Sequence, residues 1–113
     1  MVTVQERWSN PLECDNHTDA NDNPTGGSVR SVGLSIDWQD GPLGRGAERI
    51  APTGAFSEDV LLAVIQRVKF YQASKFPCRE NALAITHMEE ALHWMQARHE
   101  ERDRREVQGL HKA

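Results

Sequence analysis

Three arginines near the end of the chain have a spacing that suits phosphate binding. Arg98, Arg102 and Arg105 lie in "RHEERDRRE" at positions i, i+4 and i+7, so on a helix they project from one face. A guanidinium group can donate two parallel hydrogen bonds to a phosphate, which makes arginine better suited than lysine to this contact. The same segment contains acidic residues, and cations near a helix C-terminus interact favourably with the helix dipole. A solvated helix end is therefore the competing interpretation.

Upstream of these arginines, three other residues have side chains that suit a nucleotide. Arg79 and Asn81 occur in "CRENA" at the predicted start of the same helix, where free backbone N–H groups and the dipole favour an anion. The alternative is a surface ion pair for Arg79 and a capping or solvent-facing amide for Asn81. Tyr71 either stacks a nucleobase on its ring face or packs in the core of a hairpin. The residue types alone leave these alternatives open.

Composition excludes several classes of function. The net charge of -4 and the pI near 5.7 argue against binding to duplex nucleic acid, which needs a broad basic face. The sequence contains no P-loop, dinucleotide-binding or nucleophile-elbow motif. Its histidines are scattered, so they do not predict a metal site. We therefore expect no enzyme activity, no cofactor and no metal.

Cysteine usage and hydropathy predict the compartment. Cys14 and Cys78 are too few for a disulfide framework and lack a zinc-binding spacing. The first residues, "MVTVQERWSN", do not have the basic-then-apolar pattern of a signal peptide. The longest mainly apolar run, "VLLAVI", is far shorter than the roughly 20 residues that cross a bilayer. These features predict a reduced cytoplasmic protein with no membrane partner.

The first half of the chain, residues 1–56, is predicted to form an N-terminal arm and a small β-sheet. Residues 14–28, "CDNHTDANDNPTGGS", are dense in turn formers and are expected to form a loop. Residues 28–38, "SVRSVGLSIDW", alternate apolar and polar types, which predicts one half-buried strand of about seven to ten residues. Val2 and Val4 predict a second, shorter strand, and "QDGPLGRG" predicts a turn. The expected sheet is antiparallel and too small to be stable alone.

The second half is predicted to be a helical hairpin over residues 57–109, with a tail over 110–113. Helix one is expected over 57–75, because a good N-cap residue precedes apolar residues at helical spacing. Helix two is expected over about 78–106, and a proline between the helices ends the first one. The short connection predicts an antiparallel pair. The apolar positions of helix two are Ala84, Met88, Ala91 and Met95, flanked by Leu83, Leu92 and Trp94.

These elements predict an α+β fold, in which a small N-terminal antiparallel β-sheet is followed by a long antiparallel two-helix hairpin. A helix of about 28 residues is roughly 42 Å long and exceeds its partner by about ten residues. The overhanging end needs another partner, and a 113-residue monomer buries only a modest fraction of its surface. We therefore expect the protein to assemble as an oligomer.

Three segments together resemble a known phage family. They are "IDWQDGP", "GAFSEDVLLAVIQRVKFYQ" and "FPCRENALAITHMEEALHWMQARHEERDRREVQG". The family has a Q-x-G-P turn before a helical hairpin that contains C-R-E-N-A, E-E-A-L-x-W and a terminal R-x-x-x-R-x-x-R. It is the family of the Thoeris anti-defence sponge proteins, with a more distant similarity to the anti-CBASS cyclic-nucleotide sponges. The resemblance covers about residues 34–109, and the first 27 residues resemble no family that we can name.

The resemblance implies an oligomer that binds glycocyclic ADP-ribose, a signal made by TIR-domain proteins, between the subunits of a dimer. Some members of the family assemble three dimers into a hexamer with separate sites for cyclic di- or trinucleotides, so the resemblance leaves both a dimer and a hexamer open. The first site would use Tyr71 to stack a ring, Asn81 on the adenine side, and Arg98 and Arg102 for phosphate, with Arg105 as a further candidate. The hexamer site would use Arg79 and Arg45. Glu106 stands where relatives tend to have glycine, a difference that favours a longer helix two.

Helix geometry sets a condition on the first of these sites. Asn81 and Arg98 are 17 residues apart on one predicted helix, hence about 25 Å apart, and no small nucleotide spans that distance within one chain. A second subunit running antiparallel would place its arginine end beside Tyr71 and Asn81 of the first. The dimer would therefore complete the site.

Two hypotheses about function follow. The first is a phage anti-defence sponge that sequesters cyclic ADP-ribose-type signals in the cytoplasm of the infected bacterial host, inhibits Thoeris without degrading the signal, and also binds cyclic oligonucleotides in a hexamer. The second is a non-enzymatic helical-hairpin adaptor that binds another protein through its charged helix end. Nucleotide binding distinguishes them, because only the sponge requires it.

Overall fold

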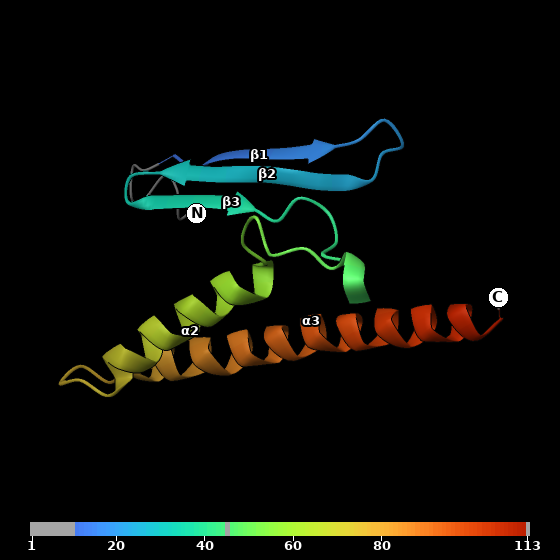
Figure 1. Ribbon diagram of the computed structural model, residues 1–113. Coiled ribbons are helices and arrows are strands. Elements are labelled where there is room, and N and C mark those ends of the chain that lie inside the picture. The colour runs from blue at the N-terminus through green and yellow to red at the C-terminus, as the bar shows by residue number, and fades with distance from the viewer. Residues whose placement is uncertain (1–10, 45, 113) are drawn as a thin grey trace. The chain divides into compact units, whose positions relative to one another are not determined.

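A computed structural model describes residues 11–44 and 46–112, and for residues 106–112 it describes the backbone alone. The chain divides into two units, residues 1–56 and residues 57–113, and Figure 1 shows a sheet in the first unit and two helices in the second. The predicted α+β fold, with a small antiparallel sheet followed by a helical hairpin, is confirmed.

The first unit contains three antiparallel strands in the order β1-β2-β3. Strand β1 is Glu13–Thr18, β2 is Pro24–Ser31 and β3 is Leu34–Trp38. Each strand pairs with its neighbour in the sequence, so the sheet is a simple meander (Figure 1). The short strand expected to contain Val2 and Val4 lies outside the described residues.

Two predictions for this unit are wrong. The segment 14–28, expected as a loop, forms most of β1 and the first part of β2. The segment 28–38, expected as one strand, is interrupted at Val32 and Gly33, where Ser31 pairs with Leu34 across a two-residue turn. Gly33 has a φ of 76°, a conformation that glycine adopts at no steric cost. Backbone pairing between neighbouring strands therefore overrides the low strand propensity of the Asn- and Asp-rich sequence.

The turn between β1 and β2 is held by one carboxylate. The Oδ1 atom of Asp19 accepts hydrogen bonds from the backbone N–H groups of Asn21 at 2.8 Å and Asn23 at 3.0 Å. The N–H groups of Asn23 and then of Asn21 stabilise the charged form, so they lower the pKa of Asp19 below its ordinary value of 3.8. Asp22 follows with a φ of 61°, which aspartate tolerates in tight turns. The predicted turn therefore exists, but it includes only the residues between Thr18 and Pro24.

Gln39, the first residue of the Q-x-G-P motif, closes the loop that follows β3. Its Oε1 atom accepts hydrogen bonds from the backbone N–H groups of Thr53 at 2.7 Å and Gly54 at 3.1 Å, and its side chain is buried. The backbone N–H of Gln39 donates to the carbonyl of Ala55 at 2.9 Å, beside the parallel bridge between Trp38 and Ala55. A Cβ atom on Gly54 would lie 2.6 Å from the carbonyl oxygen of Trp38, so only glycine fits there. The motif therefore returns the chain to the sheet just before the first long helix.

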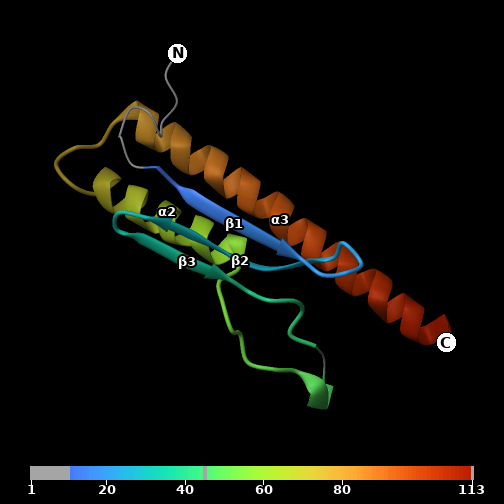
Figure 2. The same ribbon diagram turned by 90° about the horizontal axis from the view of Figure 1, so that it is seen from above.

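The second unit is an antiparallel helical hairpin of α2, Ser57–Gln72, and α3, Arg79–Lys112. Two ion pairs fix how the helices lie along each other: Lys69 Nζ is 3.2 Å from Glu89 Oε2, and His99 Nε2 is 3.1 Å from Glu58 Oε2. Figure 2 shows α3 continuing well past the N-terminal end of α2. Because Glu58 lies in the first turn of α2, the part of α3 after His99 has no α2 residue opposite it.

Three predicted boundaries of the hairpin need correction. Helix α2 ends at Gln72 rather than at 75, because the backbone N–H and the hydroxyl of Ser74 both donate to the carbonyl of Tyr71, at 3.1 and 2.5 Å. Helix α3 continues to Lys112, beyond the expected end at 106, so residues 110–112 are helical and not a tail. A single glycine, Gly109, costs a helix only about 1 kcal/mol relative to alanine and does not end it.

The apolar stripe of α3 is only partly covered. Ala84, Met88, Leu92 and Met95 are half-buried, as expected for a face directed at α2. Trp94, in contrast, is 66% exposed, and Ala91 and Leu83 are also exposed. Within the described part of the chain, Ile65 of α2 is the one apolar residue that is buried. No helix among the described residues is both long enough and apolar enough to cross a membrane.

Candidate functional site

Tyr71 and Asn81 lie on either side of the hairpin turn, and a side-chain clamp joins their two helices. The Oε1 atom of Gln72 accepts a hydrogen bond from the backbone N–H of Cys78 at 2.8 Å, and Nε2 of Gln72 donates to the Cys78 carbonyl at 3.0 Å. This amide therefore satisfies both backbone groups of the residue just before α3. Tyr71 is the neighbour of Gln72, so the clamp also fixes where the end of α2 stands relative to the start of α3.

Cys78 caps α3. Its Sγ atom accepts a hydrogen bond from the backbone N–H of Asn81 at 3.4 Å, which is the bond that an N-cap side chain makes to the third helical residue. Sulfur is a weak acceptor, so the Gln72 clamp supplements a modest cap. Sequence reasoning missed the roles of Gln72 and Cys78. The signal was present for the cysteine, which stands directly before the first helical residue of "CRENA".

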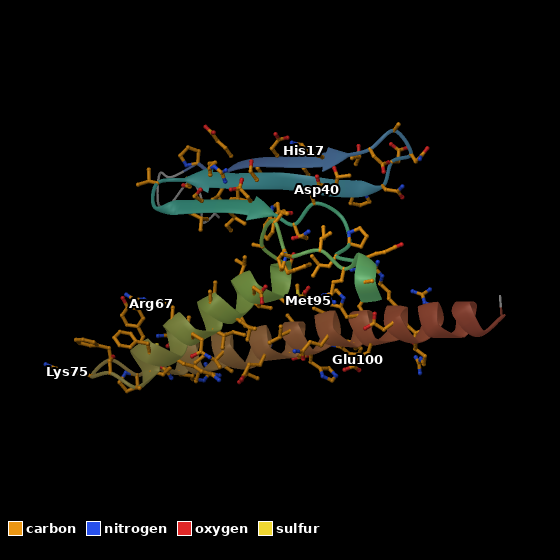
Figure 3. The ribbon with its side chains drawn as sticks, viewed as in Figure 1. His17, Asp40, Arg67, Lys75, Met95 and Glu100 are labelled. Carbon is orange, nitrogen blue, oxygen red and sulfur yellow. The ribbon has the colours of Figure 1, made fainter. Side chains whose placement is uncertain are left out.

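The ring of Tyr71 lies in a small cluster on α2. The guanidinium carbon of Arg67 is 5.0 Å from the centroid of the Tyr71 ring and 5.2 Å from that of Phe70. Nη2 of Arg67 donates to the Tyr71 hydroxyl at 3.4 Å, and the two rings meet edge to face at 5.9 Å. Tyr71 is 44% exposed, so within the described chain it is not a core residue. Figure 3 shows Arg67 and Lys75 at the turn end of the hairpin.

The polar candidates at the start of α3 differ in exposure. Asn81 is half-buried, and its side-chain amide makes no hydrogen bond to any residue that the structure describes. Arg79 is exposed in the first helical turn, next to the acidic Glu80. Neither the capping amide nor the ion pair that were considered from sequence is formed by these side chains among the described residues. Both groups are therefore available to a ligand at this end of the hairpin.

The arginines lie at the opposite end of α3. Arg98 and Arg102 are exposed, and neither forms an ion pair with a residue in the described part of the chain. Glu101 instead contacts Arg104 and lies 3.8 Å from Arg105 Nε. Among the described residues, the segment "RHEERDRRE" thus separates into two guanidinium groups without a carboxylate partner and two that share the carboxylate of Glu101. Figure 3 shows Glu100 on this part of α3 and Arg67 on α2, near the turn end of the hairpin.

The structure brings together some predicted site residues and keeps others apart. Tyr71 and Asn81 flank one turn, whereas Arg98 is 17 residues beyond Asn81 on a continuous helix, hence about 25 Å away. Arg102 and Arg105 lie further still along the same helix. One chain therefore does not assemble the whole set. Arg45 lies outside the described residues.

Comparison with known proteins identifies the family. Residues 32–99 match the family described as "Acb2/Tad1, hairpin domain", a match that begins at the turn before β3 and includes Tyr71, Asn81 and Arg98. The protein named "Thoeris anti-defense 1" from Bacillus phage SBSphiJ7 is 42% identical over 77 residues, which are 68% of this chain. The same region is 51% of the relative, so the match spans about half of the relative's length. The chain belongs to the Acb2/Tad1 hairpin-domain family.

Proposed function

We propose that the protein is a phage anti-defence sponge that binds glycocyclic ADP-ribose between two subunits and withholds it from the host's Thoeris system. The family membership and the name of the 42% identical relative support an anti-Thoeris role. The arrangement of the hairpin supports the mechanism, because its two ends have the chemistry that such a ligand requires. The protein would act in the cytoplasm of the infected bacterium.

One observation carries the proposal: the two ends of one hairpin supply different and complementary halves of a nucleotide site. The turn end offers an exposed aromatic ring, Tyr71, and the amide of Asn81, which has no partner among the described residues; they suit stacking on a purine and hydrogen bonding to its edge. The far end offers Arg98 and Arg102, whose planar guanidinium groups suit a pyrophosphate. A second subunit that runs antiparallel to the first brings a turn end beside a far end. Such a dimer contains two identical sites.

Exposed apolar surface supports self-association. Exposed apolar side chains lie on both helices and on the turn between them; they are Leu62, Val64, Phe70, Phe76, Leu83 and Trp94. The part of α3 after residue 99 is about 20 Å long and has no α2 residue opposite it. Burying the exposed apolar side chains against a second copy would stabilise a dimer, at about 25 cal/mol for each Å² of apolar area removed from water. The same contact would bring the arginine end of one subunit to the turn end of the other.

The proposed site binds its ligand and does not transform it. A ring, an amide and two guanidinium groups hold a base and phosphates, and none of them is a nucleophile or a general base at neutral pH. The messenger would therefore be recovered intact when the protein is denatured. Degraded messenger after incubation and heat denaturation would contradict sequestration.

A second class of ligand is part of the proposal. In a hexamer, Arg79 and Arg45 would bind cyclic di- or trinucleotides. Arg79 is exposed in the first turn of α3, and the backbone N–H groups of a first helical turn favour an anion. Both features support this site.

Calorimetry with a charge-reversal variant tests the proposed function. Glycocyclic ADP-ribose should bind the wild-type protein, and Arg98→Glu should abolish detectable binding, because it removes a phosphate contact and adds a repelling charge. Arg104→Glu is the matched control: it makes the same charge change on the same part of α3, at a residue that already contacts Glu101. Arg104→Glu should keep affinity within about threefold of wild type, less than the tenfold that 1.4 kcal/mol represents. If no cyclic nucleotide in a small panel binds the wild type, the adaptor hypothesis is favoured instead.

A further inference from the structure

Arg67 is placed unusually for an arginine on an exposed helix face. The positions three and four residues away on α2 are Ala63, Val64, Phe70 and Tyr71, so no acidic residue of its own helix can pair with it. Its guanidinium group instead lies over the rings of Phe70 and Tyr71, at 5.2 and 5.0 Å from their centroids. In the described part of the chain it forms no ion pair with a carboxylate. The charge of Arg67 is therefore directed at aromatic rings.

The contacts of Arg67 restrain the ring of Tyr71 in two ways. The cation is attracted to the electron-rich face of the ring, and Nη2 also donates to the phenol oxygen at 3.4 Å. Phe70 meets the same ring edge to face, with 71° between the ring planes. A ring held by a cation, a hydrogen bond and a second ring loses less rotational freedom when a ligand stacks on it. Tyr71 is still 44% exposed, so a large part of it is open to a ligand.

We propose that Arg67 is a positioning residue of the messenger site, which fixes the ring of Tyr71 so that it can stack the purine base. The inference rests on the proposed function, since it concerns the same site. Arg67 acts through Tyr71, and its guanidinium group also lies over the ring of Phe70. Its positive charge stands beside the platform, where it favours an anionic ligand.

The competing interpretation is that Arg67 merely stabilises the hairpin by covering exposed rings. Both interpretations predict a small loss of stability in Arg67→Gln. They differ in two measurements, the orientation of the Tyr71 ring in the free protein and the affinity for the messenger. The chain contains a single tyrosine, so 3-fluorotyrosine incorporation places one fluorine label on Tyr71 alone.

The experiment compares wild type with Arg67→Gln, Arg67→Lys and the control Lys75→Gln, each labelled with 3-fluorotyrosine. Lys75→Gln removes the same charge near the same end of the hairpin and leaves the ring contacts of Arg67 in place (Figure 3). Circular dichroism melts establish that each variant is folded. Fluorine NMR reports the environment of Tyr71, and calorimetry reports the affinity for glycocyclic ADP-ribose.

Arg67→Gln should shift the fluorine resonance and weaken messenger binding by about two- to fivefold, the effect of losing one exposed cation–π contact. Arg67→Lys keeps the cation but loses the planar fork, so its affinity should lie between those of wild type and Arg67→Gln. Lys75→Gln should change neither quantity by as much as Arg67→Gln.

Unchanged affinity or an unchanged resonance in Arg67→Gln overturns the inference and leaves the proposed sponge function intact. An equal loss in Lys75→Gln also overturns it. If the wild type itself does not bind the messenger, the proposed function fails and the inference falls with it.

Discussion

At the scale of single residues, some polar side chains hydrogen-bond to the backbone within the fold, and some charged side chains do not. Asp19 and Gln39 each accept two backbone N–H hydrogen bonds and hold a turn or a loop in place. Arg98 and Arg102, by contrast, lack a carboxylate partner among the described residues. Side chains that satisfy the backbone are explained by the fold, whereas Arg98 and Arg102 are the residues at which the proposal places a ligand.

Asp19 makes the stability of the first hairpin depend on pH. The N–H groups of Asn23 and Asn21 lower the pKa of Asp19 in the folded protein below its ordinary value of 3.8. The contribution of Asp19 to stability is therefore fully present above the ordinary pKa and is lost as the pH falls through the folded pKa. The difference in stability between wild type and Asp19→Asn, which keeps an acceptor oxygen but does not titrate, should shrink as the pH falls from about 5 to below 3. A difference that does not depend on pH would contradict this role.

At the scale of elements, the hairpin depends on how the end of α2 is tied to the start of α3. Gln72 makes two hydrogen bonds to the backbone of Cys78, and Cys78 in turn caps the helix that contains Asn81. Gln72→Ala should lower the free energy of unfolding by about 1–2 kcal/mol, since each net hydrogen bond contributes roughly 0.5–1.5 kcal/mol. Chemical denaturation measures this change. Gln66→Ala, at an exposed position of the same helix, is the control, and equal losses in both variants would contradict the clamp.

The helices were more predictable from sequence than the strands, for a physical reason. Apolar spacing and the proline before Cys78 are local signals, and they placed both helices to within a few residues except at the C-terminal end of α3. Strands β1 and β2 depend on pairing between segments, and a Cβ atom on Gly27 would collide with the Asp15 carbonyl oxygen, so a glycine that resembles a loop residue is required inside a strand. Such cross-strand contacts are not visible in the sequence of one strand.

The candidate site residues remain a prediction from sequence, and the contacts that support them were not predicted. Tyr71, Asn81 and Arg98 were selected by their types, by helical spacing and by resemblance to the family. The Gln72 clamp and the Arg67 contact depend on side-chain conformations at a turn, which spacing alone does not define. The proposed pairing of the two ends of the hairpin in a dimer is not visible in one chain, because Asn81 and Arg98 are about 25 Å apart on α3.

At the scale of the whole molecule, the account requires two subunits for each site. In the proposed twofold-symmetric dimer, every site would combine the turn end of one subunit with the arginine end of the other. Defects at the two ends therefore lie in different halves of a site. Two inactive variants can complement each other in a mixed dimer, which contains one site with both halves intact.

The most direct test of the account is calorimetric titration of glycocyclic ADP-ribose into Tyr71→Ala, into Arg98→Glu, and into an equal mixture of the two after subunit exchange. Each variant alone should show no tight binding. The mixture should recover wild-type affinity in about a quarter of the sites, since half of the randomly exchanged dimers are mixed and each has one intact site. A mixture that stays inactive, although mass spectrometry shows mixed dimers, would contradict a site shared between subunits.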